Sequence, residues 1–277
     1  MKLGLVLSGG GARCFAQIGV LKALEEANLY LSALAGSSTG AVLAALYAAG
    51  KSADELYDLA KHLDYKSLIG SSAPGGVSDE SDLRDWLEQH LPKTFEDLNV
   101  PVAITTTDIQ NGRLHIYSQG ELITPLCGAH AFPGLFAPVK WGDLELMDGG
   151  ILNNFPVDII RPFCKDSVMG VNCSPSPKEK VDTDKAMGLA GFARALFGPL
   201  TGQHDILPPA IQLLEKSYTI TQSRLIDVLT TLHPPDHKLV PDLPDEITIS
   251  AFDKLGEAYE IGYACAKTYL AEHLHHD

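Results

Sequence analysis

The sequence has few basic residues for its length. It contains 21 lysines and arginines against 35 aspartates and glutamates, so its formal net charge is -14 at pH 7. Nucleic acids are bound through basic surfaces that neutralise phosphates, and an acidic chain lacks that surplus. The same deficit argues against simple electrostatic docking on an anionic membrane. We therefore expect no nucleic-acid partner.

Patterned cysteines and long hydrophobic runs are also missing. The five cysteines are scattered and never spaced as Cys-x-x-Cys, which argues against a disulfide framework or a cysteine zinc site and fits a reducing compartment. The longest apolar run, residues 41–50, is far below the roughly 20 residues that span a bilayer. The first apolar stretch is too short for a signal peptide. We expect a soluble, cytoplasmic protein.

Short apolar runs alternate with helical patterns along the chain. With 277 residues, 45% of them hydrophobic, the chain suits one large α/β domain. This alternation predicts a three-layer α/β/α sandwich around a mostly parallel sheet, with one later hairpin at Asn111-Gly112. The expected strands are residues 3–7, 31–36, 100–109, 113–120, 144–148 and 167–174. The expected helices are residues 14–29, 39–50, 52–63, 82–91, 209–229 and 250–274.

The stretch Gly36-Ser37-Ser38-Thr39-Gly40 fits Gly-x-Ser-x-Gly with Ser38 at its centre. It lies between an expected strand and an expected helix, the context of a nucleophile elbow. A serine there stands at a helix N-terminus, where free N–H groups favour a developing anion. The alternative is a Gly/Ser turn in which Ser37 or Ser38 caps the helix.

A second strand-to-helix junction, Ser8 to Arg13, contains three consecutive glycines. Glycines let the backbone direct its N–H groups inward, so the loop could bind a phosphate or an oxyanion. A dinucleotide fingerprint would need glycine where Cys14 stands, and no Gly-Lys-Ser/Thr follows for a P-loop. A non-hydrolytic anion- or nucleotide-binding module and a purely structural turn remain alternatives.

Asp148 ends the short run Leu-Glu-Leu-Met-Asp and precedes Gly149 and Gly150. At a strand end, its carboxylate could reach the same sheet edge as Ser38, where α/β proteins bind ligands. The alternative is an ordinary Asp-Gly turn. His130 lies in an expected loop and could also approach the site, although no histidine stands in a recognisable triad context.

Taken together, these motifs resemble those of the patatin-like phospholipase family. The matching segments are GGGAR at 9–13, GSSTG at 36–40, FPGLFAPV at 132–139 and DGG at 148–150. The chain departs from the family pattern at Cys14, at Gln17 and in the segment GAHAFPG, which leaves substrate preference and pocket lining open.

The resemblance implies a serine acyl hydrolase with a Ser–Asp dyad and no histidine. Ser38 would be the nucleophile and Asp148 the base, and no cofactor or metal would be required. The loop that would hold the oxyanion comprises Gly9, Gly10, Gly11, Ala12 and Arg13. The substrate would be a lipid or another acyl ester, reached through transient membrane or micelle contact.

We expect a single domain over residues 1–277, with a catalytic core at 1–175 and a C-terminal helix within 246–277. Residues 176–245 contain proline and glycine breaks around one helical stretch and could form a cap or lid. A Gly/Ser/Pro-rich loop at 69–81 could contribute to such a lid. The sequence does not indicate an oligomeric state.

Overall fold

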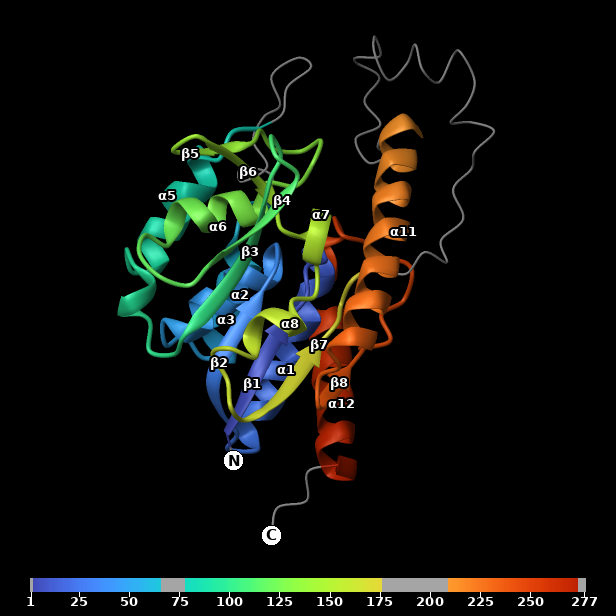
Figure 1. Ribbon diagram of the computed structural model, residues 1–277. Helices are drawn as coiled ribbons and strands as arrows, with labels where there is room; N and C mark the ends of the chain where they lie inside the picture. Colours follow the sequence, from blue (N-terminus) through green and yellow to red (C-terminus); the bar gives the residue numbers. More distant parts are fainter. Residues whose placement is uncertain (1, 66–77, 176–208, 274–277) are drawn as a thin grey trace.

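The computed structural model describes residues 2–65, 78–175 and 209–273, and it contains one central sheet with helices on both sides (Figure 1). The strands are β1 (Lys2–Leu7), β2 (Tyr30–Gly36), β3 (Val102–Asp108), β4 (Arg113–Tyr117), β5 (Val139–Trp141), β6 (Leu144–Asp148), β7 (Ser167–Val171) and β8 (His237–Leu239). The α-helices are α1 (Phe15–Glu26), α2 (Thr39–Ala48), α3 (Ala53–His62), α5 (Ser81–His90), α6 (Ile123–His130), α7 (Gly150–Asn153), α8 (Val157–Ile160), α11 (Pro209–Leu232) and α12 (Leu255–His273). Short 3-10 helices are η1 (Gly11–Cys14), η2 (Phe95–Asp97) and η3 (Phe252–Lys254).

The eight strands form a sheet in the order β5-β6-β3-β2-β1-β7-β8, and β4 also pairs with β3. The pairings β1–β2, β1–β7, β2–β3 and β7–β8 are parallel. The pairings β3–β4, β3–β6 and β5–β6 are antiparallel, so the sheet contains more antiparallel structure than the single hairpin expected from the sequence. The mostly parallel sheet is confirmed for the central strands.

One edge of β3 is shared by two strands that meet end to end. Ile104 pairs with both β2 and β4, while residues 106–108 pair with both β4 and β6. Because a strand has only two edges, β2 and β6 lie on the same one. β2 is parallel to β3 and β6 is antiparallel, so their last residues approach each other. Gly36 lies at the level of Ile104, and Asp148 lies at the level of Thr106.

Alternate side chains of the central strands face two separate cores. Leu5 and Leu7 of β1 belong to the larger core, which also holds buried residues of α1, α2, α6 and α12. Val6 faces the opposite side, where α8 and Ile226 of α11 complete a smaller core. Period-two alternation thus places helices over both faces, which confirms the predicted α/β/α sandwich.

The C-terminal helix α12 packs along α1 at close range. A Cβ on Gly19 would collide with the backbone of Tyr259, and a Cβ on Gly262 would collide with the backbone of Ala16. These two glycines therefore permit the helix–helix approach. The residues between β7 and α12 also contribute to the sheet, because β8 pairs with β7, a strand that the sequence analysis did not predict. The subdivision at residues 175 and 245 stays a prediction.

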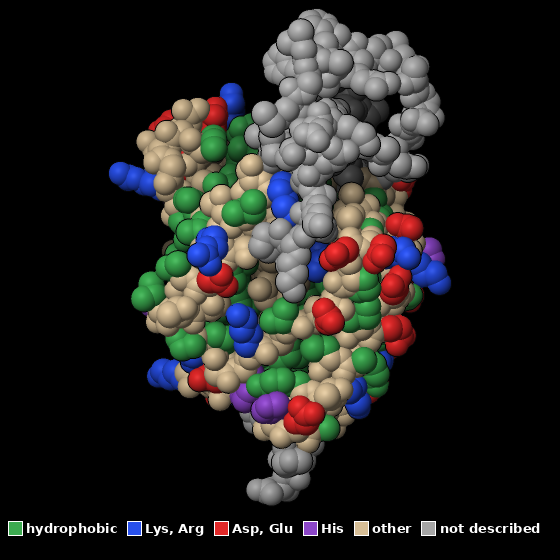
Figure 2. All heavy atoms as spheres, turned by 90° about the vertical axis from the view of Figure 1, so that its right-hand side faces the viewer, with side chains coloured by type: hydrophobic (Ala, Val, Ile, Leu, Met, Phe, Trp, Pro, Cys, Tyr) green, Lys and Arg blue, Asp and Glu red, His purple; other side chains and the backbone are tan. Residues whose placement is uncertain are grey.

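The long helix α11 lies against α7 and α8 on the side of the sheet that holds the smaller core (Figure 1). Its outer side exposes Ile220, Val228 and Leu232. Figure 2 shows the face on the α11 and α12 side, where acidic and basic side chains are scattered among apolar ones and no continuous basic surface is visible. In the part of the chain that the structure describes, no helix is both long and apolar enough to cross a membrane.

Candidate active site

Ser38 lies at a sharp turn between β2 and α2. Its backbone has φ 52° and ψ -134°, a conformation that residues other than glycine rarely adopt. A Cβ on Gly36 would lie 2.6 Å from the carbonyl oxygen of Gly40, so the turn leaves no room for a larger residue at position 36. This is the strained strand-to-helix turn that defines a nucleophile elbow.

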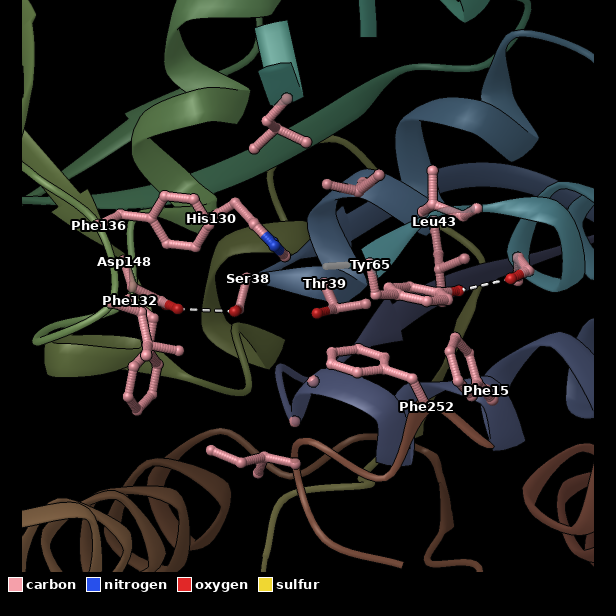
Figure 3. A pocket seen from close by; sticks show the side chains of 18 of the residues that line it. Phe15, Ser38, Thr39, Leu43, Tyr65, His130, Phe132, Phe136, Asp148 and Phe252 are labelled. Carbon is pink, nitrogen blue, oxygen red and sulfur yellow. Dashed lines mark hydrogen bonds between the residues drawn. The ribbon is translucent and has the colours of Figure 1, made fainter. Parts of the chain in front are cut away.

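The hydroxyl of Ser38 does not cap α2. Although Ser38 occupies the N-cap position, its side chain makes no capping hydrogen bond. Its Oγ instead donates to Oδ2 of Asp148 over 2.6 Å (Figure 3). The neighbouring Ser37 is buried, and its hydroxyl has no partner among the described residues. The helix-cap interpretation of Ser38 is therefore wrong.

Asp148 reaches Ser38 through the shared edge of β3. The sequence placed Asp148 at a strand end that could reach the same sheet edge as Ser38, without a direction for that strand, and the structure shows that β6 is antiparallel to β3. The backbone of Asp148 is fixed on both sides. Its N–H donates to Ala131 O over 3.0 Å, and its carbonyl accepts from Thr107 Oγ1 over 3.0 Å.

The carboxylate of Asp148 sits in a nearly dry environment. The residue is 1% exposed, and burial raises its pKa to about 6, although hydrogen bonds from Ser38 and from the Gly150 N–H lower it. The Gly150 N–H donates to Oδ1 over 2.7 Å, which leaves Oδ2 for Ser38. A carboxylate with this pKa is a better proton acceptor than an ordinary aspartate at about 3.9.

The glycine loop contributes backbone amides with no internal partner. The N–H groups of Gly9, Ala12 and Arg13 donate to the carbonyls of Asn154, Ile249 and Gly10 respectively. By contrast, the N–H groups of Gly10 and Gly11 make no hydrogen bond within the described part of the chain, and both residues line the cavity beside Ser38. Of the five loop residues suggested by the sequence, these two have amides available to a ligand.

Gly9 brings the loop against the elbow. A Cβ on Gly9 would lie 2.8 Å from Cβ of Ser38 and would also collide with the side-chain amide of Asn154. Asn154 itself donates from Nδ2 to Gly9 O over 3.4 Å and to Ser174 Oγ over 2.9 Å. Because residue 9 has no side chain, the glycine loop can lie this close to Ser38.

Arg13 is buried at 7% exposure and ties the loop to two distant segments. Its Nε donates to Cys173 O over 3.0 Å, and its Nη1 donates to Ile247 O over 2.6 Å. These contacts agree with the expectation that Arg13 steadies the loop. An electrostatic role toward an oxyanion stays a prediction.

A cavity of about 160 Å³ opens beside Ser38 and Asp148. Three aromatic rings form part of its wall, with Tyr65 stacked on Phe252 at 4.2 Å between ring centroids and tilted against Phe15 at 5.8 Å (Figure 3). Further apolar lining side chains come from α2, α3 and α5, among them Val42, Leu43, Leu46, Leu56, Leu59 and Leu83. The space next to the nucleophile is thus suited to an apolar chain.

Helix α11 closes another side of the cavity and contributes residues that the sequence analysis missed. Tyr218, Thr219 and Gln222 line the cavity, and Gln222 Nε2 donates to Gly150 O over 3.0 Å. The Tyr218 ring packs edge-on against Phe132 at 5.2 Å. The predicted lid loop at 69–81 lies largely outside the described residues, and so do residues 176–208 of the predicted cap. Helix α11 lines the cavity, and a cap or lid over residues 176–245 stays a prediction.

No group of three or more histidine, cysteine, aspartate or glutamate side chains that could hold a metal ion occurs within residues 2–65, 78–175 and 209–273. His130 approaches the site, as the sequence suggested, and lines the cavity from the end of α6. The chemistry that this arrangement offers is a hydroxyl paired with a buried carboxylate, next to unpaired amides and an apolar cavity.

Comparison with known proteins identifies relatives along the whole chain. A family model described as "Patatin-like phospholipase" matches residues 5–161, more than half of the chain. An NTE family protein of Mycobacterium tuberculosis is 29% identical over 97% of this chain and 46% of its own length. A lysophospholipase of Phaeosphaeria nodorum, NTE1, is 27% identical over 98% of this chain and 18% of its own length. The chain therefore spans less than half the length of these relatives.

Among solved structures, VipD from Legionella pneumophila superimposes with a TM-score of 0.54. The match covers 98% of this chain and 67% of VipD at 16% sequence identity, so it supports the fold alone.

Proposed function

Because the chain belongs to the patatin-like phospholipase family, we propose that it is a serine acyl hydrolase that cleaves acyl esters of lipids with Ser38 and Asp148. The observation that carries this proposal is the 2.6 Å hydrogen bond from Ser38 Oγ to the buried carboxylate of Asp148. A serine–aspartate pair on the exposed surface would be weak support for a catalytic role. A strained elbow serine paired with a buried carboxylate of raised pKa is an activated nucleophile.

In the acylation step, Ser38 Oγ attacks the ester carbonyl carbon while its proton moves to Asp148 Oδ2. The electron pair of the C=O bond moves to the carbonyl oxygen, which becomes the oxyanion of a tetrahedral intermediate. Collapse of this intermediate breaks the bond to the alcohol oxygen, which takes the proton from Asp148 and leaves. Water then attacks the acyl carbonyl carbon while Asp148 accepts one of its protons. Collapse of this second tetrahedral intermediate breaks the bond to Ser38 Oγ and releases the fatty acid, and Oγ takes the proton back from Asp148.

The amides of Gly10 and Gly11 are the proposed oxyanion donors. Both are free of hydrogen-bond partners among the described residues and lie beside the elbow. The N–H of Thr39, the first residue of α2, is a third candidate, because the residue after an elbow serine commonly contributes to the oxyanion hole. Loss of one such donor typically costs about 100-fold or more in rate.

The apolar cavity supports a lipid-type acyl chain as the part of the substrate next to Ser38. The name of the fungal relative specifies a lysophospholipase, so a monoacyl phospholipid is a reasonable first substrate to assay. A non-hydrolytic anion- or nucleotide-binding function has less support, because the available amides of the loop lie beside Ser38, whose hydroxyl is already hydrogen-bonded to the carboxylate of Asp148.

The proposal is tested by intact-mass analysis after incubation with a fluorophosphonate probe. Wild-type protein should gain a single adduct, Ser38→Ala should gain none, and the neighbouring Ser37→Ala should label like wild type. An unlabelled wild type, or a Ser38→Ala variant that still labels, would contradict the assignment and favour the non-hydrolytic alternative.

A further inference from the structure

His130 is a polar side chain on the wall of an otherwise largely apolar cavity. It is the last residue of α6, and it directly precedes Ala131, whose carbonyl accepts the backbone N–H of Asp148 over 3.0 Å. Its ring lies 5.9 Å from the Phe136 ring. In Figure 3 the imidazole extends toward Ser38. The His130 side chain therefore belongs to the same backbone segment that holds Asp148 in place.

The two ring nitrogens of His130 have different surroundings. Nδ1 is inaccessible to solvent and has no hydrogen-bond partner within the described residues. Nε2 also has no hydrogen-bond partner among the described residues, but it is not fully enclosed as Nδ1 is, and the residue is partly buried and lines the cavity. Burial lowers the pKa of His130 to about 4, so the ring is neutral near pH 7.

A neutral imidazole has one N–H and one bare nitrogen. A buried N–H without a partner is rarer and costlier than a buried acceptor without one. The bare nitrogen is therefore Nδ1, and the proton sits on Nε2. His130 consequently presents one uncharged hydrogen-bond donor to the cavity, next to the nucleophile.

An acyl ester has few groups that could accept this hydrogen bond. In the proposed function the carbonyl oxygen is held by the loop amides of Gly10 and Gly11, and the acyl chain is apolar. The remaining polar part is the alcohol from which the ester is made. We infer that His130 binds the alcohol portion of the substrate through its Nε2–H and favours esters whose alcohol carries an oxygen within reach, an inference that depends on the proposed hydrolase function.

An uncharged donor discriminates between kinds of polar group. It offers no net charge to balance a phosphate, so the partner proposed for it is an uncharged oxygen, the ester or hydroxyl oxygen of a glycerol-type alcohol. His130 thus acts as a specificity-determining residue for the alcohol, while Ser38 and Asp148 carry the reaction.

The test compares a glycerol monoester with the n-propyl ester of the same fatty acid, which has equal carbon number in the alcohol but lacks its hydroxyls. His130→Phe keeps a ring and removes the donor, and His130→Gln keeps an amide donor near the position of Nε2. We expect His130→Phe to lower kcat/KM for the glycerol ester about fivefold and to leave the propyl ester within about twofold, since a neutral hydrogen bond is worth about 1 kcal/mol. His130→Gln should recover most of the loss.

Labelling by a fluorophosphonate probe, which has no alcohol portion of this kind, should be unchanged in both variants. Equal losses for the two esters, with slower labelling, would show that His130 only supports the structure and would overturn the inference. Unchanged kinetics for both esters would overturn it as well. If wild-type protein neither labels nor hydrolyses either ester, the hydrolase function itself fails, and that outcome is distinct from the other two.

Discussion

Ser38 and Asp148 are 110 residues apart in the chain, yet Oγ of the serine lies 2.6 Å from Oδ2 of the aspartate. The contact follows from strand register. Gly36 ends β2 opposite Ile104, and Asp148 ends β6 opposite Thr106, so the two strand ends lie along a common edge of β3 with only Thr105 between their levels. The turn after β2 closes the remaining gap.

The first prediction concerns the pH dependence of hydrolysis. Burial raises the pKa of Asp148 to about 6. Below that pH the carboxyl is protonated and cannot accept the proton of Ser38, so kcat/KM should rise with pH through about 6 and level off above it. Steady-state rates between pH 4.5 and 8 measure this limb. If the midpoint of this rise in kcat/KM lies near pH 4, in the ordinary range of aspartate, the result would contradict the role of Asp148 as a buried base.

A second prediction concerns stability, because the same raised pKa destabilises the folded protein at neutral pH. In the folded state the Asp148 carboxyl keeps its proton up to about pH 6, whereas in the unfolded state it loses the proton near pH 3.9. The free energy of unfolding therefore falls as the pH rises from about 3.9 to about 6. The loss corresponds to at most about 3 kcal/mol. Asp148→Asn, which cannot ionise, should be inactive yet more stable than wild type at pH 7.5.

Urea denaturation at two pH values tests this prediction. The advantage of Asp148→Asn should shrink toward zero near pH 4, where the wild-type carboxyl is also neutral. A variant that is less stable than wild type at pH 7.5 would show that the charged carboxylate is favourably solvated by its hydrogen bonds.

The third prediction concerns Gln222, the hydrogen-bond link from α11 to the site. Its Nε2 donates to Gly150 O, and the N–H of the same Gly150 holds Asp148 Oδ1. Gln222→Leu leaves the buried Gly150 carbonyl without that donor, which should cost about 1–3 kcal/mol of stability and lower kcat by shifting Asp148. Arg224→Gln, two positions along α11 with an exposed side chain, is the matched control. Equal effects of the two variants would refute a specific role for Gln222.

The fourth prediction concerns close packing at Gly9. Gly9→Ala would place a Cβ 2.8 Å from Cβ of Ser38, so either the loop or the elbow must move. Because oxyanion donors act only at the correct position, we expect kcat to fall at least about 100-fold. Gly256→Ala is the control, since its nearest neighbour would be Tyr57 Oη at 3.5 Å, an ordinary contact. Circular dichroism should show both variants folded, and an active Gly9→Ala enzyme would rule out the loop as the oxyanion site.

Local patterns in the sequence were sufficient for Ser38 and for the main elements around it. The elbow depends on five consecutive residues, and the strands of the central sheet are short β-branched or aliphatic runs, so their signals are local. The start of α3 is another local signal, a capping box in which Glu55 N donates to Ser52 Oγ and Ser52 N donates to Glu55 Oε2.

Features set by tertiary structure were not predictable in the same way. The five residues of β6 carry no information about strand direction, so the sequence suggested that Asp148 could reach Ser38 but not the shared edge of β3 along which it does so. The three-residue β8 lies among prolines and has no alternation to detect. Gln222 and Tyr218 belong to a helix whose pattern shows an apolar face but not which buried site that face covers.

The end-to-end arrangement of β2 and β6 also bears on when the protein acquires its chemistry during synthesis. The elbow belongs to the first forty residues, whereas its carboxylate arrives only after residues 139–148 have folded back along β3. A nascent chain that ends after β3 therefore contains Ser38 but not yet the carboxylate that accepts its hydrogen bond.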